Sequence, residues 1–79
     1  MQLNKIIAKR IKVLMKERGL TQYSLSMKSG VPQSTISTIL NSKFDSMKLR
    51  IIYELCEGFE ISLTEFFDSA LFDRENIID

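Results

Sequence analysis

The sequence predicts one all-α domain of five helices. Its 79 residues are enough for a single small core, and a hydrophobic fraction of 44% is ordinary for a folded chain. One proline and three glycines interrupt a composition that is otherwise rich in helix-forming residues. Apolar residues also recur at intervals of three and four, which places them on one face of a helix. These observations argue against disorder and favour a helical fold.

The first helix is expected over residues 3–18. Gly19 follows as a C′ residue, which ends the helix. One face of this helix is an apolar stripe, formed by Ile7, Ile11, Leu14 and Met15. The lysines that lie largely off this stripe are Lys5, Lys9, Lys12 and Lys16.

The second and third helices are expected over residues 22–29 and 32–41. Thr21 is a good N-cap for the second helix. Gly30 supplies the left-handed residue of a tight reversal. Pro32 suits the first turn of the third helix, where its missing N–H is not needed. The inward residues of the third helix are Ile36, Ile39 and Leu40.

The fourth helix is expected over residues 47–57, with Gly58 as its end. The fifth is expected to start after Ser62, whose spacing to Glu65 is that of a capping box. The residues expected to face the core are Leu49, Ile52, Leu55 and Cys56 on the fourth helix, with Tyr53 as a further candidate, and Leu63, Phe66 and Phe67 on the fifth.

Residues 1–68 are therefore expected to form the domain, and residues 69–79 a C-terminal tail. The tail is more apolar than an ordinary disordered end, because it keeps Leu71, Phe72, Ile77 and Ile78. Three arrangements are open for it: an extension of the fifth helix, packing back on the domain, or contact with a second subunit.

The charges of the chain are divided unevenly along its length. Residues 1–50 hold ten basic and two acidic side chains, a net charge of +8, whereas residues 51–79 hold one basic and eight acidic side chains, a net charge of −7. Such a division indicates that the basic half meets a polyanion while the acidic half faces away or meets a partner. The simpler interpretation is a solvated helical surface.

Residues 19–41 have the layout of a helix-turn-helix, two short helices joined by a tight turn. The two helices must approach closely, and Ser26 and Ser29 provide small side chains there. Short polar groups on the exposed face of the third helix can reach base edges, and glutamine can pair with adenine through two hydrogen bonds. The residues of this face are Gln33, Ser34, Ser37 and Thr38.

An ordered set of residues at unbroken spacing runs from Ile6 to Phe67. Its members are Gly19-Leu20-Thr21-Gln22, Leu25, Gly30-Val31, Ser34-Thr35-Ile36-Ser37, Ile39, Lys43 and the segment from Ile61 to Phe67. This set resembles the phage-repressor/Cro-type helix-turn-helix family, also called the XRE family.

The resemblance implies a lambda-repressor-like five-helix domain that binds double-stranded operator DNA, acts as a transcriptional regulator, with repression expected, forms a homodimer and needs no cofactor. It also implies that the third helix, 32–41, enters the major groove. The residues matching base readers are Gln33, Ser34, Ser37 and Thr38, and those matching backbone contacts are Gln22, Thr35, Asn41 and Lys43. Because the reading face has no Arg or Lys, lysines should supply much of the affinity; Lys28 and Lys43 are candidates, followed by Arg10 and Lys48.

Several residues depart from the pattern of the family. Ser24 stands where many members of the family have glutamate, and this difference is expected to weaken the cap of the second helix. The hydroxyls of Ser26 and Ser29, where many members have alanine, are expected to find a backbone carbonyl one turn earlier. Apolar Met15 and Leu40 replace an arginine–glutamate pair, so we expect these two side chains to touch.

The composition argues against other classes of function. Without histidine and with one cysteine, the chain has no evident metal site and no nucleophile–base pair, so we expect no enzyme and place Cys56 in the core. No apolar run is long enough for a membrane span, and a cytoplasmic location is expected. No small-molecule ligand is expected. The alternative function is an antitoxin or protein-interaction adaptor with the same fold.

Overall fold

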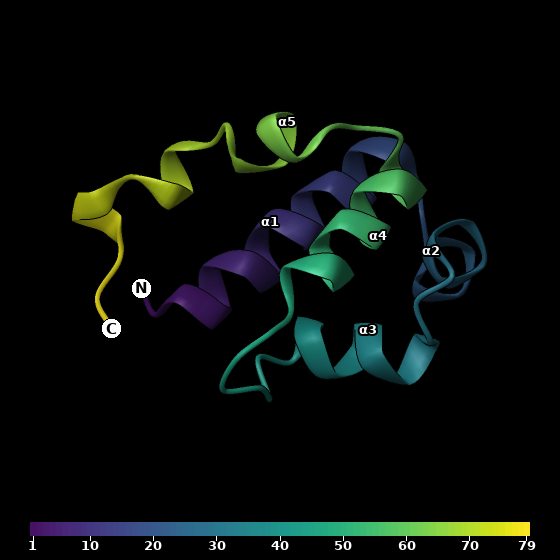
Figure 1. Cartoon of the computed structure of the whole chain (residues 1–79), viewed down its shortest axis with the longest axis horizontal. Helices are drawn as coiled ribbons and strands as arrows, with labels where there is room; N and C mark the ends of the chain where they lie inside the picture. Colours follow the sequence, from purple (N-terminus) through teal and green to yellow (C-terminus); the bar gives the residue numbers. More distant parts are fainter.

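The computed structural model describes residues 1–79 and contains only helices, turns and loops (Figure 1). This confirms the predicted all-α fold with five helices. The helices are α1 (Leu3–Arg18), α2 (Gln22–Ser29), α3 (Gln33–Leu40), α4 (Leu49–Phe59) and α5 (Leu63–Phe67), followed by the 3₁₀ turns η1 (Ala70–Phe72) and η2 (Arg74–Asn76). No helix is both long and apolar enough to span a membrane.

Helix α1 runs through the middle of the molecule and carries the predicted apolar stripe. Ile7, Ile11 and Leu14 are buried, and Met15 is partly buried at the edge of the core. The helix ends at Gly19, which is left-handed with a φ of 62° and donates its N–H to the Lys16 carbonyl. Figure 1 shows α4 alongside α1, α3 below them, α2 at one end and α5 above.

The fourth helix differs from its predicted bounds at both ends. It starts at Leu49 and continues through Gly58 to Phe59, and it ends at the left-handed Glu60. Gly58 therefore does not end the helix. A Cβ on Gly58 would lie 2.8 Å from the Ser29 Cβ, so this glycine allows α4 to approach α2 closely. Leu49 was wrongly expected in the core: it is 58% exposed, because no neighbouring element covers the first residue of α4.

One apolar cluster joins the four longer helices and α5. Its 13 buried members are Ile7, Ile11, Leu14, Leu25, Val31, Ile36, Ile39, Leu40, Ile52, Leu55, Cys56, Phe59 and Phe66. Phe66 closes the core as predicted, but Phe67 is 38% exposed. The Phe67 ring meets Phe66 and Phe72 edge-on, with centroids 5.0 Å from each.

The tail packs back on the start of α1. Helix α5 stops at Phe67, and η1 and η2 carry the chain toward its beginning. The Ile78 N–H donates to the Met1 carbonyl at 2.9 Å, and the Leu3 N–H donates to Asp79 Oδ1 at 3.3 Å. The two ends of the chain are therefore neighbours, as Figure 1 shows.

Candidate nucleic-acid interface

Helix α3 lies along one side of the molecule, with one face on the core and the other toward solvent. Ile36, Ile39 and Leu40 are buried and hold it against the rest of the core. The helix spans Gln33–Leu40, slightly shorter than the predicted 32–41, because Pro32 is its N-cap and Asn41 its C-cap. The elements that hold α3 in place are α1 and α2, which both pack against it.

The turn between α2 and α3 is fixed by one glycine and two serine hydroxyls. Gly30 is left-handed, with a φ of 78°. Ser26 Oγ donates to the Val31 carbonyl at 2.7 Å, and the Val31 N–H donates to Ser29 Oγ at 3.1 Å. The expected partner one turn earlier was wrong, because the reversal at Gly30 brings Val31 back toward the end of α2. These bonds fix the direction in which α3 leaves the turn.

The start of α2 has a complete capping box. Thr21 Oγ1 accepts from the Ser24 N–H at 3.1 Å, and Ser24 Oγ accepts from the Thr21 N–H at 2.8 Å. Ser24 therefore completes the capping box in place of a glutamate. Because a neutral hydroxyl accepts a weaker hydrogen bond than a carboxylate does, the expected weakening of this cap stays a prediction. Gln22 is the first residue of the helix and makes no hydrogen bond through its side chain within the chain.

The four predicted base readers share the outer side of α3. Gln33 and Ser34 are exposed, and their side chains make no hydrogen bond within the protein. Thr38 is exposed, but its hydroxyl donates to the Ser34 carbonyl at 3.0 Å. Ser37 is half-buried, and its Oγ lies 3.4 Å from Asn41 Nδ2. Gln33 and Ser34 therefore have the free donors and acceptors of this face.

The predicted backbone contacts fall into separate places. Asn41 and Lys43 lie together at the C-terminal end of α3, where Asn41 Nδ2 donates to the Ser37 carbonyl at 2.8 Å and the Lys43 N–H donates to the Thr38 carbonyl at 3.0 Å. Gln22 and Lys28 lie at opposite ends of α2.

Thr35 has a different setting from the other predicted backbone contacts. It is half-buried and lines a groove of about 340 Å³ with Thr38, Met47 and Lys48. This groove separates α3 from the start of α4. The roles of Thr35, Gln22, Lys28, Asn41 and Lys43 toward DNA remain predictions.

Asn4 is a positioning residue that sequence reasoning missed. Its Nδ2 donates to the Ser42 carbonyl at 3.4 Å and to the Phe44 carbonyl at 3.1 Å, so α1 holds the loop that follows α3. Asn4 continues the stripe of Ile7, Ile11 and Leu14 toward the N-terminus, as its one polar member. A polar residue on an apolar stripe was the available signal.

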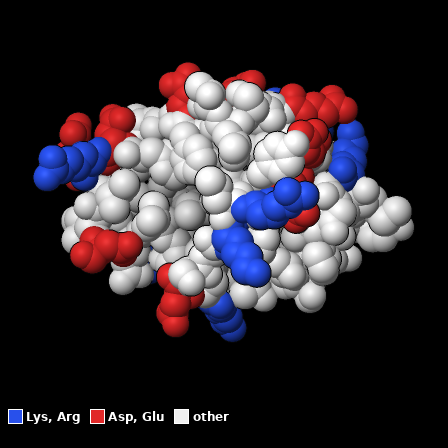
Figure 2. Space-filling view, viewed as in Figure 1, with Lys and Arg blue, Asp and Glu red and all other residues white.

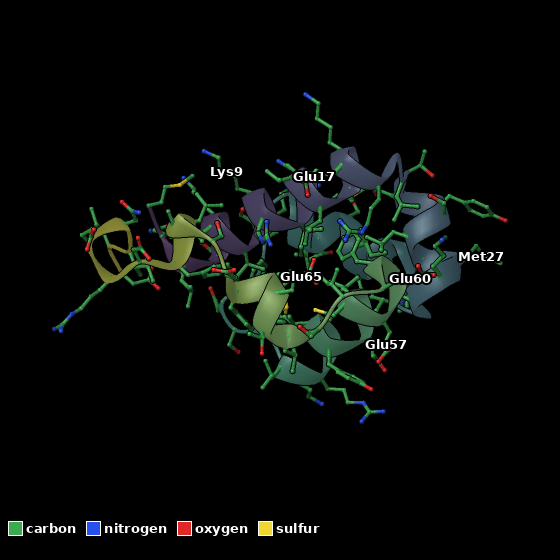
Figure 3. All side chains as sticks on the ribbon, turned by 90° about the horizontal axis from the view of Figure 1, so that it is seen from above. Lys9, Glu17, Met27, Glu57, Glu60 and Glu65 are labelled. Carbon is green, nitrogen blue, oxygen red and sulfur yellow. The ribbon has the colours of Figure 1, made fainter.

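The lysines carry most of the free positive charge of the surface. All seven lysines are exposed, and none takes part in an ion pair. Acidic side chains gather along the upper edge in Figure 2, over α5 and the neighbouring end of α4. In Figure 3, Lys9 points outward from α1, whereas Glu57, Glu60 and Glu65 lie on the side of α4 and α5. Figure 2 also shows acidic side chains beside Lys and Arg at both ends and along the lower edge, so the division of charge along the sequence is only partly a division in space.

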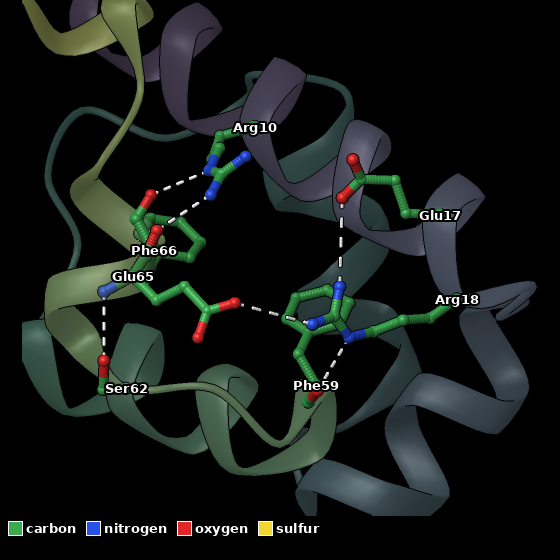
Figure 4. A network of polar contacts seen from close by, with 7 residues as sticks. All are labelled: Arg10, Glu17, Arg18, Phe59, Ser62, Glu65 and Phe66. Carbon is green, nitrogen blue, oxygen red and sulfur yellow. Dashed lines mark hydrogen bonds and ion pairs between the residues drawn. The ribbon is translucent and has the colours of Figure 1, made fainter.

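In contrast to the lysines, the two arginines of α1 bind backbone carbonyls of other helices (Figure 4). Arg10 donates to the Phe66 and Glu65 carbonyls at 2.7 and 2.9 Å, at the end of α5. Arg18 donates to the Phe59 carbonyl at 2.8 Å, at the end of α4, and lies 3.8 Å from the Glu65 carboxylate. Each satisfies one carbonyl that a helix end leaves free, the Phe66 carbonyl for Arg10 and the Phe59 carbonyl for Arg18. Arg10 was therefore a wrong candidate for phosphate binding.

Cys56 is a core residue, as predicted. It is buried within the apolar cluster, with 1% of its surface exposed. Burial, followed by the charge of Glu57, raises the pKa of the Cys56 thiol to about 11. The thiol is therefore protonated near neutral pH and is a poor nucleophile.

Comparisons with known proteins agree with this geometry. A family model described as the Cro/C1-type HTH DNA-binding domain matches residues 10–69. Among curated proteins, none matches the chain. The wild-type restriction-modification controller protein C.Esp1396I is 26% identical, with a TM-score of 0.78, over 86% of this chain and 86% of that chain.

Two further solved structures extend the comparison. The C.Esp1396I tetramer in complex with its natural 35 base-pair operator is 26% identical, with a TM-score of 0.76, over 86% of this chain and 88% of that chain. Prophage Lp1 protein 11 is 20% identical, with a TM-score of 0.80, over 92% of this chain and 97% of that chain, and shares the fold. Because the family model spans residues 10–69, including the whole of α2, the turn and α3, the chain belongs to the Cro/C1-type helix-turn-helix DNA-binding family.

Proposed function

We propose that this protein is a transcriptional regulator, and specifically a repressor, that inserts α3 into the major groove of an operator. The observation that carries the proposal is the outer side of α3, where Gln33 and Ser34 have unused hydrogen-bonding groups on a helix fixed by the Ser26 and Ser29 hydroxyls. A fixed helix with free polar groups can match base edges without first breaking internal bonds. The similar controller protein has been solved with its operator.

In this proposal, bases and phosphates are contacted by different residues. Gln33, Ser34, Ser37 and Thr38 face the base edges. Asn41 and Lys43 face one phosphate strand beside the end of α3, and Gln22 faces a phosphate at the start of α2. Lys28 and Thr35 complete the backbone contacts. Contacts to phosphates carry little sequence information. The preference for one operator therefore depends on the four residues of α3 that face the base edges.

We further propose that the protein binds DNA as a homodimer. Helix α3 has eight residues and can reach only a few base pairs, which is too few for a specific site. Two copies on a two-fold operator would place their α3 helices about 34 Å apart, one turn of DNA. The proposal assigns no catalytic activity and a cytoplasmic location, where an operator would be found.

The test begins with selection of bound sequences from a pool of random duplexes. The selected duplex gives the operator and, from the spacing of its half-sites, the geometry of the dimer. Replacing both Gln33 and Ser37 by alanine should then weaken operator binding about 10- to 100-fold, because base contacts are lost. Binding to a random duplex should not change.

The control for this experiment is Thr64→Ala, an exposed polar residue on α5. It should leave operator binding unchanged. Equal operator affinity in the wild type and in the Gln33→Ala, Ser37→Ala variant, measured by fluorescence anisotropy, would show that α3 does not read bases.

A protein-interaction role is the second candidate, as an antitoxin or adaptor. The acidic side chains over α4 and α5, including Glu57, Glu60 and Glu65, favour it, because they form a surface suited to a basic partner (Figure 3). This role predicts no retention on any duplex DNA at low salt, whereas the regulator is retained.

A further inference from the structure

A basic groove lies between α1 and the C-terminal end of α3. Its volume is about 460 Å³. Lys5, Lys9 and Lys12 of α1 form one wall, and Asn41 and Ser42 lie on the other. No aspartate or glutamate lines the groove. It is distinct from the base-reading side of α3 and shares only the end of that helix with the predicted interface.

The three lysines form one row with unbalanced charge. Their spacing of four and then three residues places them on the same side of α1. All three are exposed, and none has an ion-pair or hydrogen-bond partner. Lysines at this spacing repel each other. A bound anion would interact favourably with all three and would offset this repulsion.

The dimensions of the row suit a nucleic-acid strand. From Lys5 to Lys12 the axis of α1 advances by about 10 Å, at 1.5 Å per residue. Along a DNA strand one phosphate follows another at about 3.4 Å of axial rise, so the row can face about three phosphates. Ammonium groups on flexible stems can follow such a strand without selecting a base sequence.

The groove also lies in the right place. Asn41 borders it and is, in the proposed function, a contact to the phosphate strand beside the end of α3. A strand held at Asn41 continues either toward the base-reading face or away from it. The direction away from that face leads along the groove and past the lysines of α1.

We propose that Lys5, Lys9 and Lys12 form a second phosphate-binding surface, which holds the DNA strand next to Asn41 beyond the bases that α3 reads. This inference rests on the proposed function and adds a contact outside the helix-turn-helix. The surface increases affinity for any duplex of sufficient length, and it leaves the choice of sequence to α3.

The test replaces all three lysines by glutamine in the full chain. Duplex binding is measured by fluorescence anisotropy over a series of NaCl concentrations, with the selected operator and with a random duplex. The slope of log K against log [salt] should fall in magnitude by about 2 to 3, because each lost phosphate contact contributes about 0.9. Both affinities should fall together, so the ratio of operator to random binding should stay constant.

A control variant separates this surface from the effect of net charge. Arg74→Glu with Thr64→Glu lowers the net charge by the same three units, at exposed positions on η2 and α5. It should change the salt slope by less than the lysine variant does. Thermal unfolding followed by circular dichroism should show no loss of stability in the lysine variant, because the three side chains make no contact that glutamine removes and glutamine relieves their mutual repulsion.

The outcomes separate the inference from the function on which it rests. Retained operator binding with an unchanged slope, or with a slope equal to that of the control variant, would overturn the phosphate surface and leave the regulator in place. If the wild-type protein binds no duplex even at low salt, the proposed function and the surface both fall. A hydroxyl-radical footprint that is shorter for the lysine variant, by about three nucleotides next to the Asn41 contact, would support the surface.

Discussion

Gly58 faces Ser29 across the contact between α4 and α2, where a Cβ would lie 2.8 Å from the Ser29 Cβ and 3.1 Å from the Ser29 nitrogen. Replacing it by alanine has two opposing effects. Alanine favours a helix interior by up to about 1 kcal/mol, whereas overpacking costs about 1–3 kcal/mol. We expect Gly58→Ala to lower the free energy of unfolding by about 1–2 kcal/mol, measured with urea.

Measuring Gly58→Ala again in a Ser29→Gly variant tests whether the contact with the Ser29 side chain causes the loss of stability. Ser29→Gly removes the Cβ that alanine would meet, so the loss from Gly58→Ala should be smaller in that background. Equal losses in both backgrounds would mean that the contact with the Ser29 Cβ does not decide the outcome.

At the residue scale, the two arginines of α1 and the lysines have different roles. Arg10 and Arg18 donate to carbonyls at the ends of α5 and α4, which removes them from the free charge of the surface. The lysines keep their charge in solvent. Sequence reasoning could count these charges but could not assign them, because the carbonyl that accepts from Arg10 is 56 residues away along the chain.

At the scale of elements, α1 and α3 are joined by an apolar contact region in place of an ion pair. Leu40 is a member of the main apolar cluster, Met15 is partly buried against that cluster, and α1 packs on α3. Their direct contact remains a prediction. If they touch, the losses of unfolding free energy in Met15→Ala and Leu40→Ala should be non-additive, with a coupling of at least about 0.5 kcal/mol in urea unfolding.

Introducing a charged pair at positions 15 and 40 is a second test of their contact. Leu40 is only 9% exposed and belongs to the main apolar cluster, so Leu40→Glu should lower the free energy of unfolding by about 2 kcal/mol or more, because it places a carboxylate against the apolar core. Adding Met15→Arg should recover part of this loss. No recovery, together with additive alanine variants, would place the two side chains apart.

The helix-turn-helix was the most predictable element of the chain. Thr21, Gly30 and Pro32 act on the backbone within one turn of their own positions, so their roles could be predicted without a fold. The loop after α3 could not be derived in this way. Its position depends on Asn4, which lies 40 residues from the Phe44 carbonyl that accepts its hydrogen bond.

At the scale of the molecule, the tail joins the end of the chain to its beginning. Phe72 packs on the core with its ring centroid 6.0 Å from that of Phe66, and the Ile78 N–H donates to the Met1 carbonyl. We propose that residues 1–68 nevertheless fold as a unit. A chain ending at residue 68 should unfold cooperatively, with a free energy of unfolding lower by about 1–3 kcal/mol, because it loses the partly buried Phe72.

The full-length Phe72→Ala variant is the matched control for this truncation. It should account for most of the loss, since the remaining tail residues are mainly exposed. A truncated chain without a cooperative transition in circular dichroism would show that the tail is part of the domain.

The sequence by itself determined the five helices, the turn at Gly30 and the polar outer side of α3. These features follow from periodicity, caps and a single left-handed residue, all of which act over a few neighbouring residues. Only the tertiary structure decided that Gly58 serves a helix contact, that Arg10 is bound to α5, and that the lysines of α1 border the end of α3. These facts depend on which distant segments meet when the core is buried, and local patterns carry no information about that.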